Sequence, residues 1–337
     1  MKNIIKSLIV MLSSVSLFTS VNAGEVSVSG TAKATYNILS GKTNVGKGLG
    51  ITNELNFTAS GETDQGYTWN YSMELDPGAV TAAGQAAEND DTKLTVGTPY
   101  GTFGVFISEG GLDVEDAASQ SAYSRPTDMG DPSATVDNFT IDSYNNVQYH
   151  TPADMLPFGI TAKIAYAPDL DDTAPASSGN NAGAVSTKSN TFAGENATEI
   201  QVKAAPIDGL TIGASYFDFS QDGVAKMDQN AESGAYYATY SQGAVSVGYS
   251  QAYRAERLEN ASILQSDKAS NIDYYDQVNY SIAFAATDDI SVSYEQETSE
   301  AVKVQSGTTN VEQKSTGVQI AYTMGGMTLA LAHNSHD

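Results

Sequence analysis

The sequence has no cysteine, and this absence removes several classes of site at once. Disulfide bridges, thiolate nucleophiles and cysteine-ligated zinc are all excluded. Basic residues are also scarce, with 16 Lys and Arg against 40 Asp and Glu, which gives a formal net charge of −24. A general nucleic-acid binder needs clustered Lys and Arg to neutralise phosphates, so that class is excluded as well.

Long hydrophobic runs are missing too, apart from a short one near the N-terminus. Lysines open the chain, residues 8–18 are mostly apolar, and Val21-Asn22-Ala23 has the small residues of a cleavage site. A membrane-spanning helix would need about 20 apolar residues, and this stretch is shorter and interrupted by serines. The pattern predicts a secretory signal peptide over residues 1–23, followed by one unit over residues 24–337.

What is abundant is an alternation of apolar and polar residues with a period of two. The clearest segment is 67–76, in which tyrosine, tryptophan, methionine and leucine alternate with polar side chains. Fifteen segments of this kind predict 15 β-strands and an all-β fold. Their connections alternate as well, between tight links such as 206–209 and long polar loops such as 168–198. This layout is typical of a transmembrane antiparallel up-and-down β-barrel, with short turns at one end and long loops at the other.

A soluble β-sandwich is the main alternative, because its strands alternate in the same way. A sandwich, however, needs bulky apolar residues on the inner faces of both sheets. Here one strand face carries Tyr, Val, Ile and Leu, and the other carries Ser, Thr, Asn, Gln, Gly and charges. A polar inner face favours a water-filled barrel. An exported acidic adhesin or surface protein is the alternative, and a requirement for detergent distinguishes the two.

The strand count bears on how the barrel closes. Unpaired backbone groups are costly in hydrocarbon, and single-chain bacterial barrels close with an even number of strands. With 15 strands, the chain ends on the loop side. We therefore expect a 16-stranded barrel whose last strand is missing from this sequence, unless a strand was miscounted or the edge closes in another way.

Three motifs in order resemble the Gram-negative general porins. They are Val28–Tyr36, Leu94–Phe106 and Asn145–Pro152. The resemblance covers nearly the whole mature chain and implies a 16-stranded, homotrimeric outer-membrane barrel. It also implies outer-membrane lipid and the barrel-assembly machinery as partners. Two positions depart from the family pattern, since the chain ends in Asp337 instead of an aromatic residue and has Gln148 where an arginine is frequent.

The same resemblance implies a third loop, residues 108–142, that folds into the barrel and narrows it. A cluster of acids at a constriction would attract cations, and we expect the group between Glu109 and Asp116 to line the pore most closely. The alternative is a solvated outer loop. The candidate constriction residues are Glu109, Asp113, Glu115, Asp116, Arg125, Asp128 and Asp131, with Asp137 and Asp142 as further acids of the loop.

The inward strand faces carry charges of both signs, which suggests a balanced wall whose net field is decided by the loops. The basic candidates are Lys33, Lys93, Lys163, Lys203 and Arg254. The acidic ones are Glu54, Glu74, Asp76, Glu295 and Glu297. Related porins imply that Lys33 and Lys93 face the acidic loop, with His150 as a pH-dependent addition; simple solvation of these lysines is the alternative. The balanced wall and the acidic loop together predict a weak to moderate preference for cations.

No catalytic constellation is found in the sequence. Ser335-His336-Asp337 has the letters of a triad, but adjacent residues cannot take relay geometry. His333 and His336 lack metal-site spacing. We therefore predict a channel without enzymatic activity, cofactor or metal, through which small hydrophilic solutes and ions diffuse passively. A substrate-specific channel of the same fold is the alternative.

Overall fold

The computed structural model describes most of the chain after residue 25. The described residues are 26–40, 45–77, 87–128, 137–168, 170, 196–220, 227–229, 231–255, 258–259, 272–303 and 310–337. The predicted signal peptide and Asp131 lie outside them.

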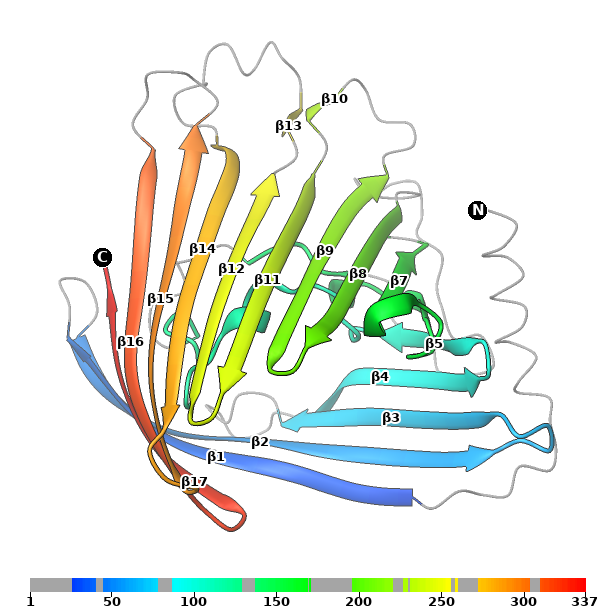
Figure 1. The fold of residues 1–337 in the computed structure, drawn as a ribbon, viewed down its shortest axis with the longest axis horizontal. Coiled ribbons are helices and arrows are strands. Elements are labelled where there is room, and N and C mark those ends of the chain that lie inside the picture. The colour runs from blue at the N-terminus through cyan, green and yellow to red at the C-terminus, as the bar shows by residue number, and fades with distance from the viewer. Residues whose placement is uncertain are drawn as a thin grey trace.

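Fifteen strands form one antiparallel sheet in which each strand pairs with its neighbours along the chain (Figure 1). The strands of this sheet are β1 (Val26–Ser40), β2 (Val45–Glu62), β3 (Thr68–Pro77), β4 (Ala87–Thr98), β5 (Gly101–Ile107), β6 (Asn146–His150), β7 (Thr161–Ala167), β8 (Asn196–Ile207), β9 (Leu210–Ser220), β11 (Glu232–Gln242), β12 (Val245–Ala255), β14 (Ile272–Ala285), β15 (Ile290–Lys303), β16 (Val311–Met324) and β17 (Met327–His336). Short 3₁₀ helices are η2 (Glu115–Ala118), η3 (Ile141–Ser143) and η4 (Pro157–Gly159). The predicted number of strands and the up-and-down order are confirmed.

Two further strands lie outside the main sheet. Strands β10 (Met227–Gln229) and β13 (Leu258–Glu259) pair with each other in a small second sheet. Both lie in segments, 220–233 and 255–272, that the alternation pattern predicts to be long polar loops. Segments of two or three residues are too short for a period of two to show, so the pattern could not find them.

The main sheet curls around an interior, as the ribbon in Figure 1 shows. Strands β1 and β17 are the two ends of the ladder, and among the described residues no pairing joins them. No helix in the described part of the chain is long and apolar enough to cross a membrane.

The outer face of the sheet is apolar and exposed. In β12, Val245 and Val247 point outward, while Ser246 and Ser250 point inward on the alternate positions. Tyrosine rings form a row on the outside, with centroids 5.2 Å apart between Tyr249 and Tyr280. An apolar outer band with an aromatic row is what a barrel presents to lipid.

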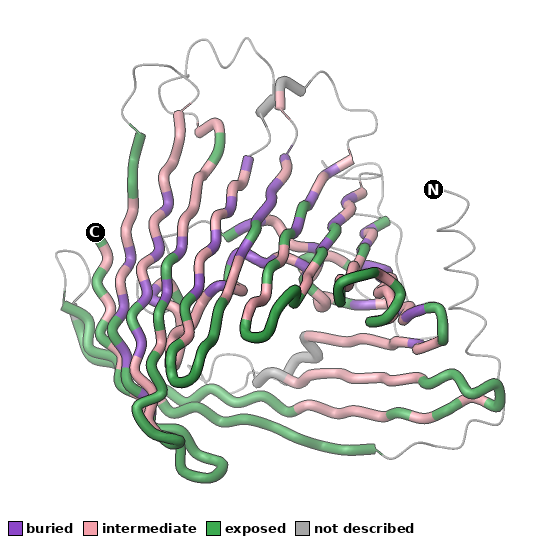
Figure 2. The backbone as a smooth tube through the Cα atoms, in the orientation of Figure 1, coloured by how far each residue is buried: buried purple, intermediate pink, exposed green. Residues whose placement is uncertain are grey.

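The buried residues gather inside the curve of the sheet (Figure 2). The two hydrophobic clusters among them lie between the inner faces of β7–β12 and the connection between β5 and β6. The sequence pattern predicted an inner face that is polar throughout, and the structure differs from that prediction. Phe217 and Phe219 on β9 point inward and pack against this connection, so a hydrophobic cluster lies where only polar side chains were expected.

Candidate functional site

The connection between β5 and β6 crosses the barrel interior and is called the arch here (residues 108–128 and 137–145). Its helix η2 contacts the inner faces of β11, β12 and β14 (Figure 1). The arch therefore lies across part of the interior that the sheet encloses.

Side chains of successive wall strands hold the backbone of the arch. Irregular backbone buried away from bulk water needs such partners. The bonds, in strand order from β9 to β16, are Val114 N to Ser215 Oγ (3.2 Å), Ser250 Oγ to Glu115 O (2.7 Å), Ser281 Oγ to Ala118 O (2.6 Å), Ala122 N to Ser293 Oγ (2.8 Å) and Tyr123 N to Gln319 Oε1 (3.0 Å). The path of the arch is thus fixed strand by strand. These inward serines and the glutamine could not be recognised as anchors from the sequence, because small polar residues on an inner face are equally suited to contact with water.

Gly248 on β12 lets the arch approach the wall. A methyl group at this position would collide with the carbonyl oxygen of Ala118 at the end of η2. Only glycine leaves room for this contact between backbones.

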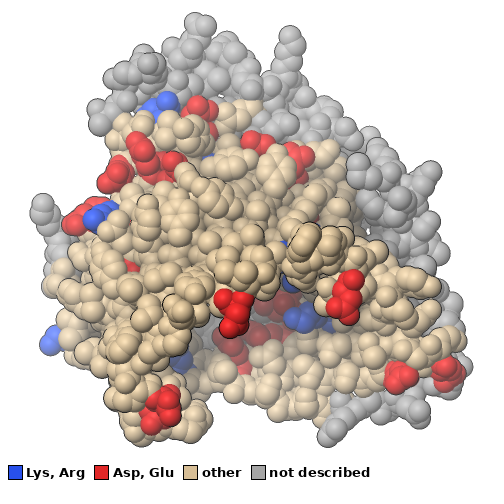
Figure 3. All heavy atoms as spheres, in the orientation of Figure 1, with Lys and Arg blue, Asp and Glu red and all other residues tan. Residues whose placement is uncertain are grey.

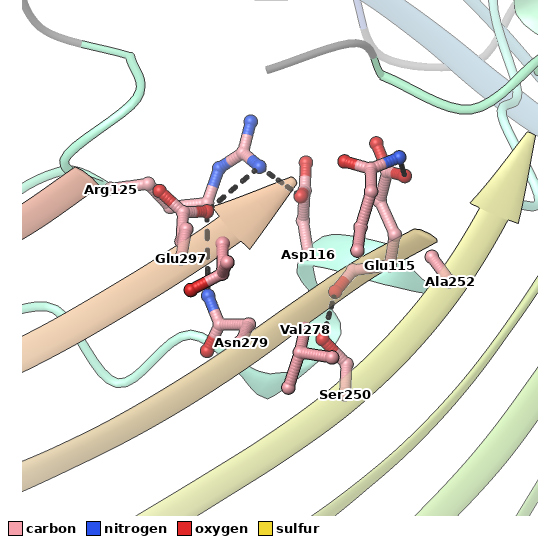
Figure 4. A pocket seen from close by; sticks show the side chains of 10 residues that line it. Glu115, Asp116, Arg125, Ser250, Ala252, Val278, Asn279 and Glu297 are labelled. Atoms are coloured by element: carbon pink, nitrogen blue, oxygen red, sulfur yellow. Dashed lines mark hydrogen bonds and ion pairs between the residues drawn. The ribbon is translucent and has the colours of Figure 1, made fainter. Parts of the chain in front are cut away.

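Arg125 anchors the far end of the arch (Figure 4). Its guanidinium pairs with Asp116, with Asp128 (Nη2 to Oδ1, 2.9 Å) and with Glu297 on β15 (Nη1 to Oε1, 3.4 Å). The other oxygen of Glu297 accepts bonds from the backbone N–H of Thr127 (3.1 Å) and from its hydroxyl (2.6 Å). Burial lowers the pKa of Arg125, but the three carboxylates outweigh it and hold the pKa above its usual value. Arg125 is therefore a permanently charged tie between arch and wall.

A small pocket lies beside this ion-pair network (Figure 4). Its volume of about 20 Å³ has room for one water molecule. Its lining includes Glu115, Asp116, Arg125, Asn279 and Glu297. At the described residues, no group of three or more His, Asp or Glu is placed to hold a metal ion.

Two of the predicted constriction acids are turned toward the protein. The side chain of Glu115 is only 9% exposed, and both its oxygens accept from the backbone N–H of Asn138 at 3.1 Å. Asp113 accepts from Ser215 Oγ at 3.0 Å and from the backbone N–H of Glu115 at 3.0 Å. Burial raises the pKa of Glu115 well above its usual range, and the charges of Asp113 and Asp116 add to the rise. Burial also raises the pKa of Asp113, although its hydrogen bonds oppose the effect.

The five predicted basic wall residues all lie on the inner face, and three of them meet the arch. Lys93 forms an ion pair with Glu109 (Nζ to Oε1, 2.8 Å). Lys33 lies over the ring of Tyr123, 4.9 Å from its centroid. Arg254 stacks on the ring of Phe139 at 4.0 Å and donates to the carbonyl of Asp137 (2.6 Å).

The other two basic residues lie on the wall away from those contacts. Lys163 on β7 pairs in register with His150 and lies within electrostatic range of Lys93 and Lys203. Lys203 is 6.0 Å from the ring of Tyr237. Figure 3 shows side chains of both charge signs together in the hollow at the lower centre of the view.

The acidic wall residues divide between the two sides of the barrel. Glu295 and Glu297 on β15 hold the arch, with Glu295 accepting from Ser119 Oγ at 2.6 Å. Glu54 on β2 instead receives a weak bond from Thr31 (3.3 Å) and remains exposed. Glu74 also lies in the described part of β3, whereas the side chain of Asp76 lies outside it.

Comparison with known proteins gives the family. A family model described as Gram-negative porin matches residues 9–337. A porin structure refined at 1.8 Å resolution matches with a TM-score of 0.59 and 14% identity, over 93% of this chain and 95% of that one. No curated protein sequence matches the chain.

Two other solved structures give the same picture. A mutant of Rh. blastica porin has a TM-score of 0.58 and 14% identity, over 92% of this chain and 94% of that one. A loop-deletion mutant of OmpT, an outer membrane protein of Vibrio cholerae, has a TM-score of 0.57 and 14% identity, over 94% of both chains. At such identities these structures bear on the fold alone, and they confirm the predicted porin type of barrel. Because the family model spans nearly the whole sequence and the strand order is that of solved porins, this protein belongs to the Gram-negative porin family.

Proposed function

We propose that this porin is a water-filled channel for passive diffusion of small hydrophilic solutes and ions, with the arch as its narrowest part. The observation that carries the proposal is the fixed path of the arch across the interior, held by side chains from β8 to β16. A polar hollow supports it. This hollow measures about 550 Å³ and is lined by Ser60, Thr68, Asn70, Thr95 and Thr102, among others, on β2–β5. Glu62 and Trp69 also contribute to this lining, so the hollow offers hydroxyl and amide groups and one carboxylate to small hydrophilic solutes.

We also propose a weak to moderate preference for cations. Seven acids of the constriction loop lie in the described residues, and Arg125 is the one base among them. Lys93 and Arg125 offset part of this charge through their ion pairs. The remaining excess favours cations in a passage lined by protein of low dielectric constant.

We infer the lipid partner of the channel from its outer face. The exposed aliphatic and tyrosine side chains of the outer face fit outer-membrane lipid. A homotrimer and insertion by the barrel-assembly machinery belong to the same proposal.

A planar bilayer under a potassium chloride gradient tests the function. We expect stepwise conductance and a reversal potential of the cation-selective sign. Heat-denatured protein in the same detergent is the control for leakage. A reversal potential of the anion-selective sign would overturn the ion preference, and the absence of steps with correctly folded protein would overturn the channel itself.

A further inference from the structure

The two legs of the arch lie side by side where it leaves β5 and returns to β6. The outgoing leg is residues 109–113 and the returning leg is residues 138–142. A hydrogen bond between the legs connects them, from Asn138 Nδ2 to Asp113 Oδ1 (3.3 Å). The legs are where the arch joins the wall strands β5 and β6.

A single carboxylate from the wall holds both legs. Glu199 on β8 is 0% exposed, and its Oε2 accepts the backbone N–H of Leu112 (3.3 Å) and that of Ile141 (2.9 Å). One residue belongs to the outgoing leg and the other to the returning leg. Its second oxygen is buried without a hydrogen-bond partner among the described residues.

A side-chain amide from another strand joins the same two legs. Asn146 on β6 is 2% exposed, and its Nδ2 lies 3.1 Å from the carbonyl of Glu109, 3.2 Å from that of Ile141 and 2.9 Å from that of Tyr144. Ile141 is therefore held at both polar backbone atoms. Glu199 takes its N–H and Asn146 donates to its carbonyl.

An apolar cluster keeps water away from these bonds. Leu112, Ile141, Ala165 and Phe217 are buried around the legs. In such surroundings, a backbone group that loses its partner is left without a hydrogen bond and without water to replace it. The legs therefore have little freedom to separate while both side chains are in place.

We propose that Asn146 and Glu199 form a clasp that sets the aperture of the pore by locking the two legs of the arch together. The inference rests on the proposed channel function and adds residues that do not face the pore water. Both act through the arch backbone, so they are positioning residues. The acids that do face the passage would set selectivity, and the clasp would set size.

The experiment measures aperture by excluding polyethylene glycols of graded size from single channels. For Glu199→Ala and for Asn146→Ala we expect a larger exclusion size, noisier open-channel current and roughly twofold higher permeation of the largest polymer that the wild type partly excludes. Glu54→Ala is the matched control. It also removes one inward carboxylate, but from a side chain whose one hydrogen bond among the described residues is with Thr31 on the neighbouring strand. It is therefore expected to change ion preference and leave the exclusion size unchanged.

Two conservative variants keep the test decisive if an alanine variant fails to fold. Glu199→Gln retains an oxygen acceptor and is expected to restore the wild-type exclusion size. Glu199→Asp shortens the side chain, so one oxygen cannot reach both N–H groups, and an intermediate size is expected. The double alanine variant is expected to show less than the sum of the single effects, because both residues hold the same legs.

The outcomes separate the clasp from the channel function. A wild type that conducts, with folded Glu199→Ala, Glu199→Asp and Asn146→Ala that exclude polymers as the wild type does, overturns the clasp alone. A folded wild type that does not conduct overturns the proposed function, and with it the clasp as a device that sets the aperture of a pore.

Discussion

The two ends of the arch are attached to the wall by different physics. The legs are buried in an apolar cluster and are held by neutral backbone groups that meet Asn146 and Glu199. The far end is held by the charged group of Arg125, whose partners Asp116 and Asp128 are partly exposed. Exposed ion pairs contribute about 0–1 kcal/mol each to stability, and they weaken as the salt concentration rises. Hydrogen bonds and packed rings that are shielded from water do not weaken with salt in this way. The attachment of the arch is therefore expected to be insensitive to salt at its legs and partly sensitive to salt at its far end.

The largest expected effect comes from the apolar support of the legs. Phe217→Ala removes a buried ring that lies 5.9 Å from the ring of Phe139 on the returning leg. Such truncations lower the free energy of unfolding by about 3–5 kcal/mol. Urea unfolding of the protein in lipid vesicles would measure this loss. Phe284→Ala is the control, because it removes a phenylalanine ring from the exposed outer face. It is expected to lower the free energy of unfolding by less. Equal losses would mean that the inner cluster adds no stability of its own.

Gly248→Ala tests the middle of the arch. The added methyl group meets the carbonyl oxygen of Ala118, so η2 must move away from β12. We expect overpacking to lower the free energy of unfolding by about 1–3 kcal/mol and to change the single-channel conductance. Gly50→Ala is the control, because a methyl there meets only Thr35 at 3.6 Å. An unchanged conductance in Gly248→Ala would show that η2 does not narrow the passage.

Arg125→Ala tests the far end. It removes the ties to Asp116 and Asp128 and leaves Glu297 without its cation. We expect the free energy of unfolding to fall by about 1–2 kcal/mol and the single-channel conductance to rise above the wild-type value. The difference is expected to shrink at 1 M salt, where the screening length is about 3 Å. Lys163→Ala, another inner-face base, controls for loss of positive charge, and a salt-independent difference would contradict an ionic attachment.

The smallest expected effect is a dependence of ion preference on pH. Burial raises the pKa of Asp113, Glu115 and Asp142, so these acids bind protons at a pH where exposed carboxyls, with pKa near about 4, are still charged. Cation preference is therefore expected to fall as pH drops toward the usual carboxyl range, and the fall begins while exposed carboxyls are still charged. Reversal potentials measure the change, and Glu115→Gln is expected to reduce it. A flat profile down to the usual carboxyl range would contradict the prediction.

The same pKa values fix the sign of the effect on stability. The folded state binds these protons more tightly than the unfolded chain, so the docked arch is most stable at low pH. It loses stability as pH rises from the usual carboxyl range through the raised folded values. A pH change thus acts on the acid-rich part of the arch, while salt acts on Arg125.

The 15 strands of the main sheet could be predicted from sequence because each of them obeys a local rule. Alternation in 67–76, for example, requires only that one face meets lipid and the other water. The position of the constriction loop came from resemblance to a family, and its charged residues could be named in the same way. What local patterns could not supply was the direction in which each acid points.

Glu115 and Glu199 show why the site was only partly predictable. Both are carboxylates expected to prefer water, and both are buried because distant backbone N–H groups meet them. The partner of Glu199 at Ile141 is 58 residues away in the chain, so no spacing rule identifies it. Phe217 was missed for the related reason that an inward aromatic residue makes sense only once the arch covers it.

The way the arch is fastened also bears on when it can form. Tyr123 is separated from its partner Gln319 by 196 residues, and Ser119 from Glu295 by 176. Contacts of such long sequence separation are slow to form, since the closure entropy of the intervening chain must be overcome first. These bonds also need β15 and β16 already in place. Docking of the arch is therefore a late folding event, and the completed passage reports that nearly the whole sheet has assembled.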